Sequence, residues 1–172
     1  MAVLFDTEDK KYGYGQIEPN RCSFLHDGNI ESQCKATVDL ENGWIVKVDK
    51  ANGTVTTATE FKGLCGVNYT AERIYERATG LKNFKVKAGE YPRVGYHKTG
   101  DVWTTNAVTT TLTEGAINTA ITAASGLFVK PDRTLTSAGQ PVGDFGLQVV
   151  ELTTMPDGAP AVKIQVVPGK AE

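Results

Sequence analysis

The chain has 172 residues and a formal net charge of −2, from 18 basic and 20 acidic residues. This balance argues against a nucleic-acid surface that works by neutralising phosphates, and no apolar run approaches the roughly 20 residues of a membrane-spanning helix. The N-terminal sequence carries acidic residues where a secretory signal would carry basic ones, so we expect synthesis and folding in a cytosol.

The cysteine, glycine and threonine content indicates an all-β protein without a disulfide framework. Cys22, Cys34 and Cys65 are odd in number and irregularly spaced, which favours free, mostly buried thiols. The 18 glycines and the abundant threonines are typical of strands joined by tight turns.

Residues 1–29 show no sustained hydrophobic period, and we interpret them as an extended N-terminal arm. The arm is more apolar than a merely solvated tail needs, so we expect it to dock on its own body or on a neighbouring subunit. A frayed terminus that contacts nothing is the alternative. The candidate interface residues are Leu4, Phe5, Tyr12 and Tyr14.

A β-hairpin is predicted over residues 43–58, within a first β unit that covers residues 30–98. Residues 44–46 and 48 are β-branched or aromatic, Asn52 and Gly53 are a strong turn signal, and residues 54–58 form the return strand. Further on, residues 63–69 read as a short strand, residues 71–78 as a helical turn, and residues 84–87 as a half-buried strand with strict alternation.

The second half of the chain resembles the first, which predicts an internal duplication. Residues 30–49 align without a gap on residues 113–132, so that Gly43 matches Gly126. With a shorter second turn, three further identities follow: Thr54, Thr56 and Ala58 match Thr134, Thr136 and Ala138. We therefore expect two related small β-barrel or sandwich units, which can also pack as one compact domain.

The second unit covers residues 99–172 and should end in a hairpin, because residues 147–153 and 161–167 flank a strong turn at residues 156–158. Residues 114–124 are ambiguous. Thr113 could cap a helix that Gly126 closes, but β-branched content and the alignment favour strand or irregular structure, which we predict.

The sequence offers no catalytic, cofactor-binding or metal site. The only two histidines, His26 and His97, exclude a site that needs several imidazoles, and Cys22 with His26 lacks the second ligand pair of a zinc site. Ser23, His26 and Asp27 are triad residue types in a turn-rich segment, but no nucleophile-elbow pattern accompanies them. We expect a protein that is not an enzyme.

Three aromatic residues, Tyr91, Tyr96 and Trp103, are the best candidates for ligand contact from sequence. Flat rings on a β scaffold can stack on sugars or form a hot spot of a protein interface. The alternative is that they cover the core beneath a long loop.

The pattern of residues 30–32, 39–43, 45–49 and 53–55 resembles small virion structural proteins of tailed phages, in particular the β-barrel decoration proteins on the outside of the capsid. The resemblance implies a β domain, often trimeric, whose N-terminal segment docks on the capsid, with no catalytic residues. Two consecutive units would depart from the simplest member of the family.

We therefore expect a structural protein of the virion, made in the host cytoplasm. Its partners would be the major capsid protein or other virion subunits and further copies of itself, with no nucleic acid and no membrane. The alternatives are a carbohydrate-binding or host-attachment module, and a neck or tail protein.

Overall fold

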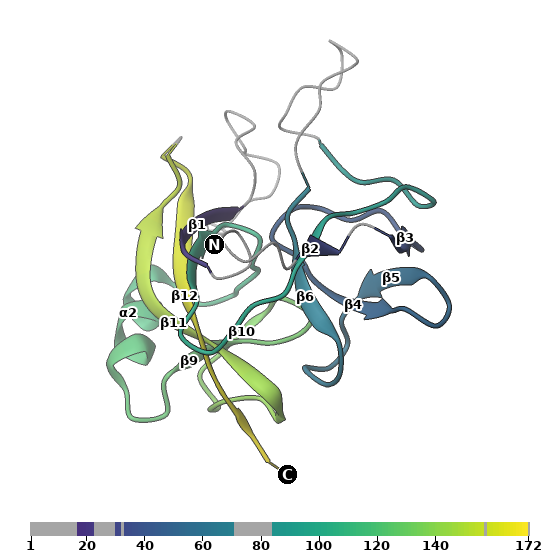
Figure 1. Cartoon of the computed structure of the whole chain (residues 1–172). Coiled ribbons are helices and arrows are strands. Elements are labelled where there is room, and N and C mark those ends of the chain that lie inside the picture. Colours follow the sequence, from purple (N-terminus) through teal and green to yellow (C-terminus); the bar gives the residue numbers. More distant parts are fainter. Residues whose placement is uncertain (1–16, 23–29, 32, 71–83, 157, 172) are drawn as a thin grey trace.

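The computed structural model describes residues 17–22, 30–31, 33–70, 84–156 and 158–171. The described chain forms two six-stranded sheets and one short helix (Figure 1), so the all-β prediction is confirmed. The candidate interface residues Leu4, Phe5, Tyr12 and Tyr14, and the helical turn expected at residues 71–78, lie outside the described residues.

Sheet A has the strand order β1-β8-β12-β11-β9-β10, and every neighbouring pair is antiparallel. Its strands are β1 (Ile17–Arg21), β8 (Val102–Thr105), β9 (Leu127–Val129), β10 (Leu135–Thr136), β11 (Gly143–Thr154) and β12 (Pro160–Lys170). The long β11–β12 pair is the terminal hairpin that the sequence predicted.

Sheet B has the order β2-β7-β6-β4-β5-β3, and only the β3–β5 pair is parallel. Its strands are β2 (Ile30–Glu31), β3 (Lys35–Ala36), β4 (Ile45–Asp49), β5 (Thr54–Thr57), β6 (Cys65–Asn68) and β7 (Val94–Gly95). The β4–β5 pair is the predicted hairpin, with Gly53 at φ 64° in its turn.

The two sheets share one connectivity. Strands β2, β4, β5, β6 and β7 have the same spatial order and pairing sense as β8, β9, β10, β11 and β12. Gly43 and Gly126, which the alignment matches, both have positive φ, 83° and 68°. The segments before them differ, however, and so does the register of the hairpins. Val46 pairs with Thr57, whereas Val129, its match in the alignment, pairs with Leu135. The duplication remains a prediction.

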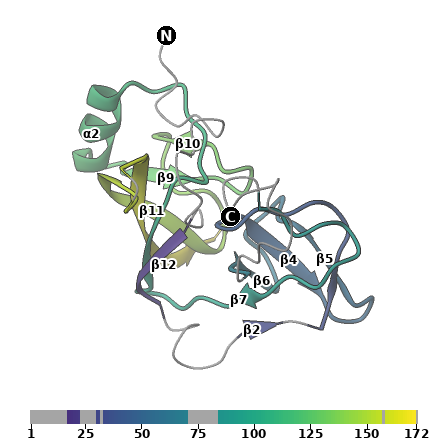
Figure 2. The same ribbon diagram turned by 90° about the horizontal axis from the view of Figure 1, so that it is seen from above.

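Residues 114–122 form helix α2 (Glu114–Thr122), so the prediction of strand or irregular structure was wrong. The Thr113 side chain accepts a hydrogen bond from the Ala116 backbone amide, which caps the first turn. Ile117 and Ala120 are three residues apart and buried, because the helix packs against β9 and β11 (Figure 2). Burial of that face outweighs the weak helix propensity of the threonines.

Two other expectations need correction. Within the proposed arm of residues 1–29, Ile17–Arg21 forms the edge strand β1 of sheet A, and Ile17 is buried in the core. The expected strand at residues 84–87 contributes only an isolated bridge between Val86 and Leu40, although its alternation is real: Val86 is buried and Lys87 is exposed.

Strand β4 separates two hydrophobic cores. Its residue Ile45 belongs to a large core built from both sheets and α2, whereas Val46 and Val48 face a smaller core on the other side of sheet B. A strand can serve both because successive side chains point to opposite faces. The three cysteines are buried, as predicted.

The backbones of the two halves also meet directly. Phe61, after β5, forms an isolated parallel bridge with Gly143 at the start of β11, and the Asp144 amide donates to the Phe61 carbonyl over 2.6 Å. A Cβ at Gly143 would lie 2.7 Å from the Phe61 carbonyl oxygen, so this approach requires glycine.

Candidate functional site

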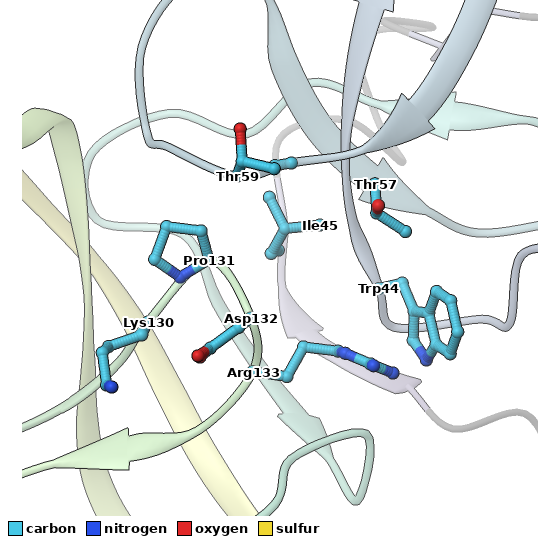
Figure 3. Close-up of a pocket in the computed structure, with 9 residues that line it drawn as sticks. Trp44, Ile45, Thr57, Thr59, Lys130, Pro131, Asp132 and Arg133 are labelled. Atoms are coloured by element: carbon cyan, nitrogen blue, oxygen red, sulfur yellow. The ribbon is translucent and has the colours of Figure 1, made fainter.

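A pocket of about 460 Å³ lies where the β9–β10 turn meets sheet B. One wall is formed by residues 44–45 and 57–59, around the start of β4 and the end of β5, and the other by residues 130–133 of the turn (Figure 3). The volume falls in the range of about 300 to 1,000 Å³ that is usual for ligand pockets.

The turn that forms the second wall holds an arginine in a backbone conformation that favours glycine. The Arg133 amide donates to the Lys130 carbonyl over 2.8 Å, with Pro131 at the second position of the turn. Arg133 then has φ 70°, and it is the only non-glycine residue with positive φ in the described chain. Hairpin loops of this kind usually place glycine there. The left-handed region costs a residue with a Cβ about 1 to 2 kcal/mol.

The first hairpin provides the matching case. When Thr54 is aligned with Thr134, Gly53 stands opposite Arg133, and their φ values are 64° and 70°. The same backbone conformation thus carries glycine in one hairpin and arginine in the other.

The Arg133 side chain crosses the pocket and stacks on Trp44. Its guanidinium carbon lies 3.7 Å from the centroid of the Trp44 ring, and Figure 3 shows the side chain reaching from the turn toward the indole. Burial lowers the pKa of Arg133, while the negative charges of Glu41 and Asp132 oppose that shift. Arginine remains protonated under such perturbation. Within the described part of the chain, the guanidinium makes no hydrogen bond and no ion pair.

The acidic groups near Arg133 are engaged elsewhere. The Asp132 carboxylate accepts hydrogen bonds from the Thr134 amide over 2.9 Å and from the Thr134 hydroxyl over 2.6 Å, and these bonds lower its pKa. Glu41 is buried and forms a 2.9 Å ion pair with Lys85. The pocket therefore offers an aromatic surface with a partly desolvated cation whose N–H donors are available.

The aromatic residues singled out from sequence do not form one exposed group. Trp103 is 0 % exposed, because β8 is an inner strand and alternation turns this ring into the larger core. Tyr96 is half-buried against the smaller core, and only Tyr91 is largely exposed, with the Lys35 ammonium 5.4 Å from its ring. Trp103 is thus a core residue and not a member of a ligand-binding loop.

The side chains of His97, Cys22 and Cys65 are of types that can take part in catalysis, but their surroundings make them unreactive. The centroid of the His97 ring lies 6.0 Å from that of Trp103 and 4.2 Å from that of Phe145, and burial lowers the pKa of His97 to about 4. Burial also raises the pKa of Cys22 to about 12 and raises that of Cys65. Among the described residues, no group of three or more His, Cys, Asp or Glu side chains could hold a metal ion. No helix in this part of the chain could span a membrane.

Sequence reasoning missed Arg133 and used Trp44 only as a strand residue. The available signal was the duplication itself, because it sets a Pro-Asp-Arg turn against a turn that ends in glycine. An arginine at such a turn position is a candidate for function, since backbone strain concentrates at binding sites.

Comparison of the chain with protein-family models, with curated proteins and with solved structures found no match. The case for function therefore rests on the residues and on the geometry of this pocket.

Proposed function

We propose that this protein is a structural protein of a phage virion, which binds the outer surface of the capsid as a decoration or stabilising protein. The observation that carries the proposal is the pocket in which Arg133 stacks on Trp44. Tryptophan and arginine are among the residue types most enriched in the hot spots of protein interfaces, which lie in well-packed, desolvated pockets. This composition suits the capture of a protein partner better than catalysis.

Two further observations support the proposal. The all-β fold agrees with the fold that the sequence resemblance implies. The pocket is also formed by segments of two hydrogen-bonded hairpins, which suits a protein that acts by contact alone. On a repetitive shell, many weak contacts of this kind would add through effective concentration, so that no single site need be strong.

The test is co-sedimentation of the purified protein with capsids that lack decoration proteins. Saturable binding is expected for the unmodified protein, and Arg133→Gln should reduce it. Arg93→Gln is the matched control, because it makes the same chemical change at an exposed position outside the pocket.

Tails and glycans serve as the other binding targets in this experiment. Binding to isolated tails in place of capsids would relocate the protein within the particle and overturn the decoration proposal. Binding to glycans without binding to particles would replace it with a host-attachment function.

A further inference from the structure

We propose that the pocket formed by Trp44 and Arg133 binds a carboxylate group, supplied by an aspartate or glutamate side chain of the partner protein. This inference rests on the proposed function, because the partner is taken to be a protein. It adds the chemistry that the partner must present.

The geometry of Arg133 leaves the correct donors available. A guanidinium that stacks on an indole uses its flat face, whereas its N–H groups lie in the plane and point outward. The Arg133 guanidinium carbon lies 3.7 Å from the centroid of the Trp44 ring, and the guanidinium donates to no described residue. A carboxylate that approaches the edge of this group can accept two parallel hydrogen bonds, and a planar guanidinium is suited to that bidentate contact.

The charges around the pocket favour an anion. Lys130 lies in the wall beside Arg133, and its ammonium forms no ion pair with a described residue. Two acids act on the charge of Arg133. Glu41 is neutralised by its ion pair with Lys85, and Asp132, although bonded to Thr134, keeps its charge, which the two cations Arg133 and Lys130 outweigh. Partial burial of the guanidinium strengthens its attraction for a carboxylate, because less water screens the pair.

The pocket has apolar surface for the rest of the side chain. Trp44, Ile45, Ala58 and Pro131 contribute to its walls, so the methylene groups of a glutamate can pack while the carboxylate meets Arg133. The strained backbone of Arg133 also supports a binding role for its side chain, since glycine would fit this turn with less strain.

The test is a titration followed by NMR, with the Trp44 indole N–H and the Arg133 Nε–H as reporters. The probe is N-acetylglutamate with its α-carboxyl group amidated, so that the side chain carries its only carboxylate. N-acetylglutamine amidated in the same way is its neutral control of almost the same shape. These two compounds are called the acid and the amide. We expect saturable shifts of both reporters with the acid and none with the amide. Arg133→Gln should weaken the response by roughly tenfold or more, because a charge-assisted pair of hydrogen bonds is lost, and Arg93→Gln should leave it unchanged.

Three results would overturn the inference. Equal responses to the acid and the amide would show that charge is not recognised. An unchanged response in Arg133→Gln would show that another group binds the probe. Shifts with glucuronate but none with the amidated N-acetylglutamate would assign the site to an acidic sugar.

The inference and the proposed function can fail separately. If the amidated N-acetylglutamate binds but capsids do not, the decoration proposal fails and the carboxylate site stands. If capsids bind equally well to Arg133→Gln and to the unmodified protein, the decoration proposal stands and this site does not supply the contact.

Discussion

Replacing Arg133 with glycine removes the side chain on which binding depends and gives the β9–β10 turn the residue that its backbone favours. We expect Arg133→Gly to abolish the response to the amidated N-acetylglutamate while the fold remains nearly as stable. Function and stability should separate at this position because Arg133 holds a φ of 70° and makes no hydrogen bond from its side chain within the described chain.

The magnitude follows from three opposing terms. Relief of the left-handed conformation should stabilise the protein by about 1 to 2 kcal/mol. Loss of the contact between the guanidinium and Trp44 should cost about 0.5 to 2 kcal/mol. The greater freedom of glycine in the unfolded chain should cost a further 0.5 to 1 kcal/mol, roughly. The net change should stay within about 2 kcal/mol.

Thermal unfolding followed by circular dichroism measures this change. For a chain of this size, 1 kcal/mol corresponds to a shift in Tm of about 2 to 4 °C, so we expect a shift of no more than about 8 °C. Arg133→Ala is the control, because it loses the same contact and keeps most of the strain, and it should be less stable than Arg133→Gly. A loss above about 3 kcal/mol in Arg133→Gly would show that Arg133 is held in place for stability, and the reasoning would be refuted.

Three other predictions concern the rest of the molecule. Gly53→Ala should destabilise the protein by about 1 kcal/mol in a urea titration, because the added Cβ meets no atom within 4 Å and the cost is backbone strain alone; an unchanged midpoint would contradict this. Burial lowers the pKa of His97 to about 4 against the opposing charge of Asp101, so the folded state binds fewer protons than the unfolded one between about pH 6.5 and 4. The contribution of His97 to stability should therefore be full above pH 6.5, and stability should fall by on the order of 2 to 3 kcal/mol as the pH drops to 4. In urea titrations, His97→Leu should flatten that dependence and the control His26→Gln should not. The three buried thiols should resist alkylation in the native protein and give three labels per chain once it is denatured without reductant; fewer labels in the denatured protein would indicate a disulfide.

Local signals account for what the sequence predicted well. The β4–β5 hairpin follows from β-branched strands on either side of Asn52 and Gly53, and the terminal hairpin follows from alternating strands around a Pro-Asp-Gly turn. Helix α2 was predicted wrongly, because the helix propensity of its residues is poor and its stability comes from burying Ile117 and Ala120 against sheet A. Local sequence patterns do not reveal such a tertiary contact.

The pocket could not be predicted for a related reason. Trp44 and Arg133 are nearly 90 positions apart in the sequence, and they meet only because the two sheets pack together. The pairing of β1 with β8 has the same long-range character, and it turned part of an expected arm into an edge strand. In both cases the residue types were informative, but their partners were set by tertiary structure.

The backbone bridge between Phe61 and Gly143 affects how well the pocket is preorganised for a partner. One wall of the pocket belongs to each sheet, and the hydrogen bond from Asp144 to Phe61 joins the two sheets by main-chain atoms. Such a junction fixes the spacing of the walls before any partner arrives. Binding would then not have to order the pocket, so no affinity would be lost to that entropic cost. This is the advantage of a preorganised binding surface.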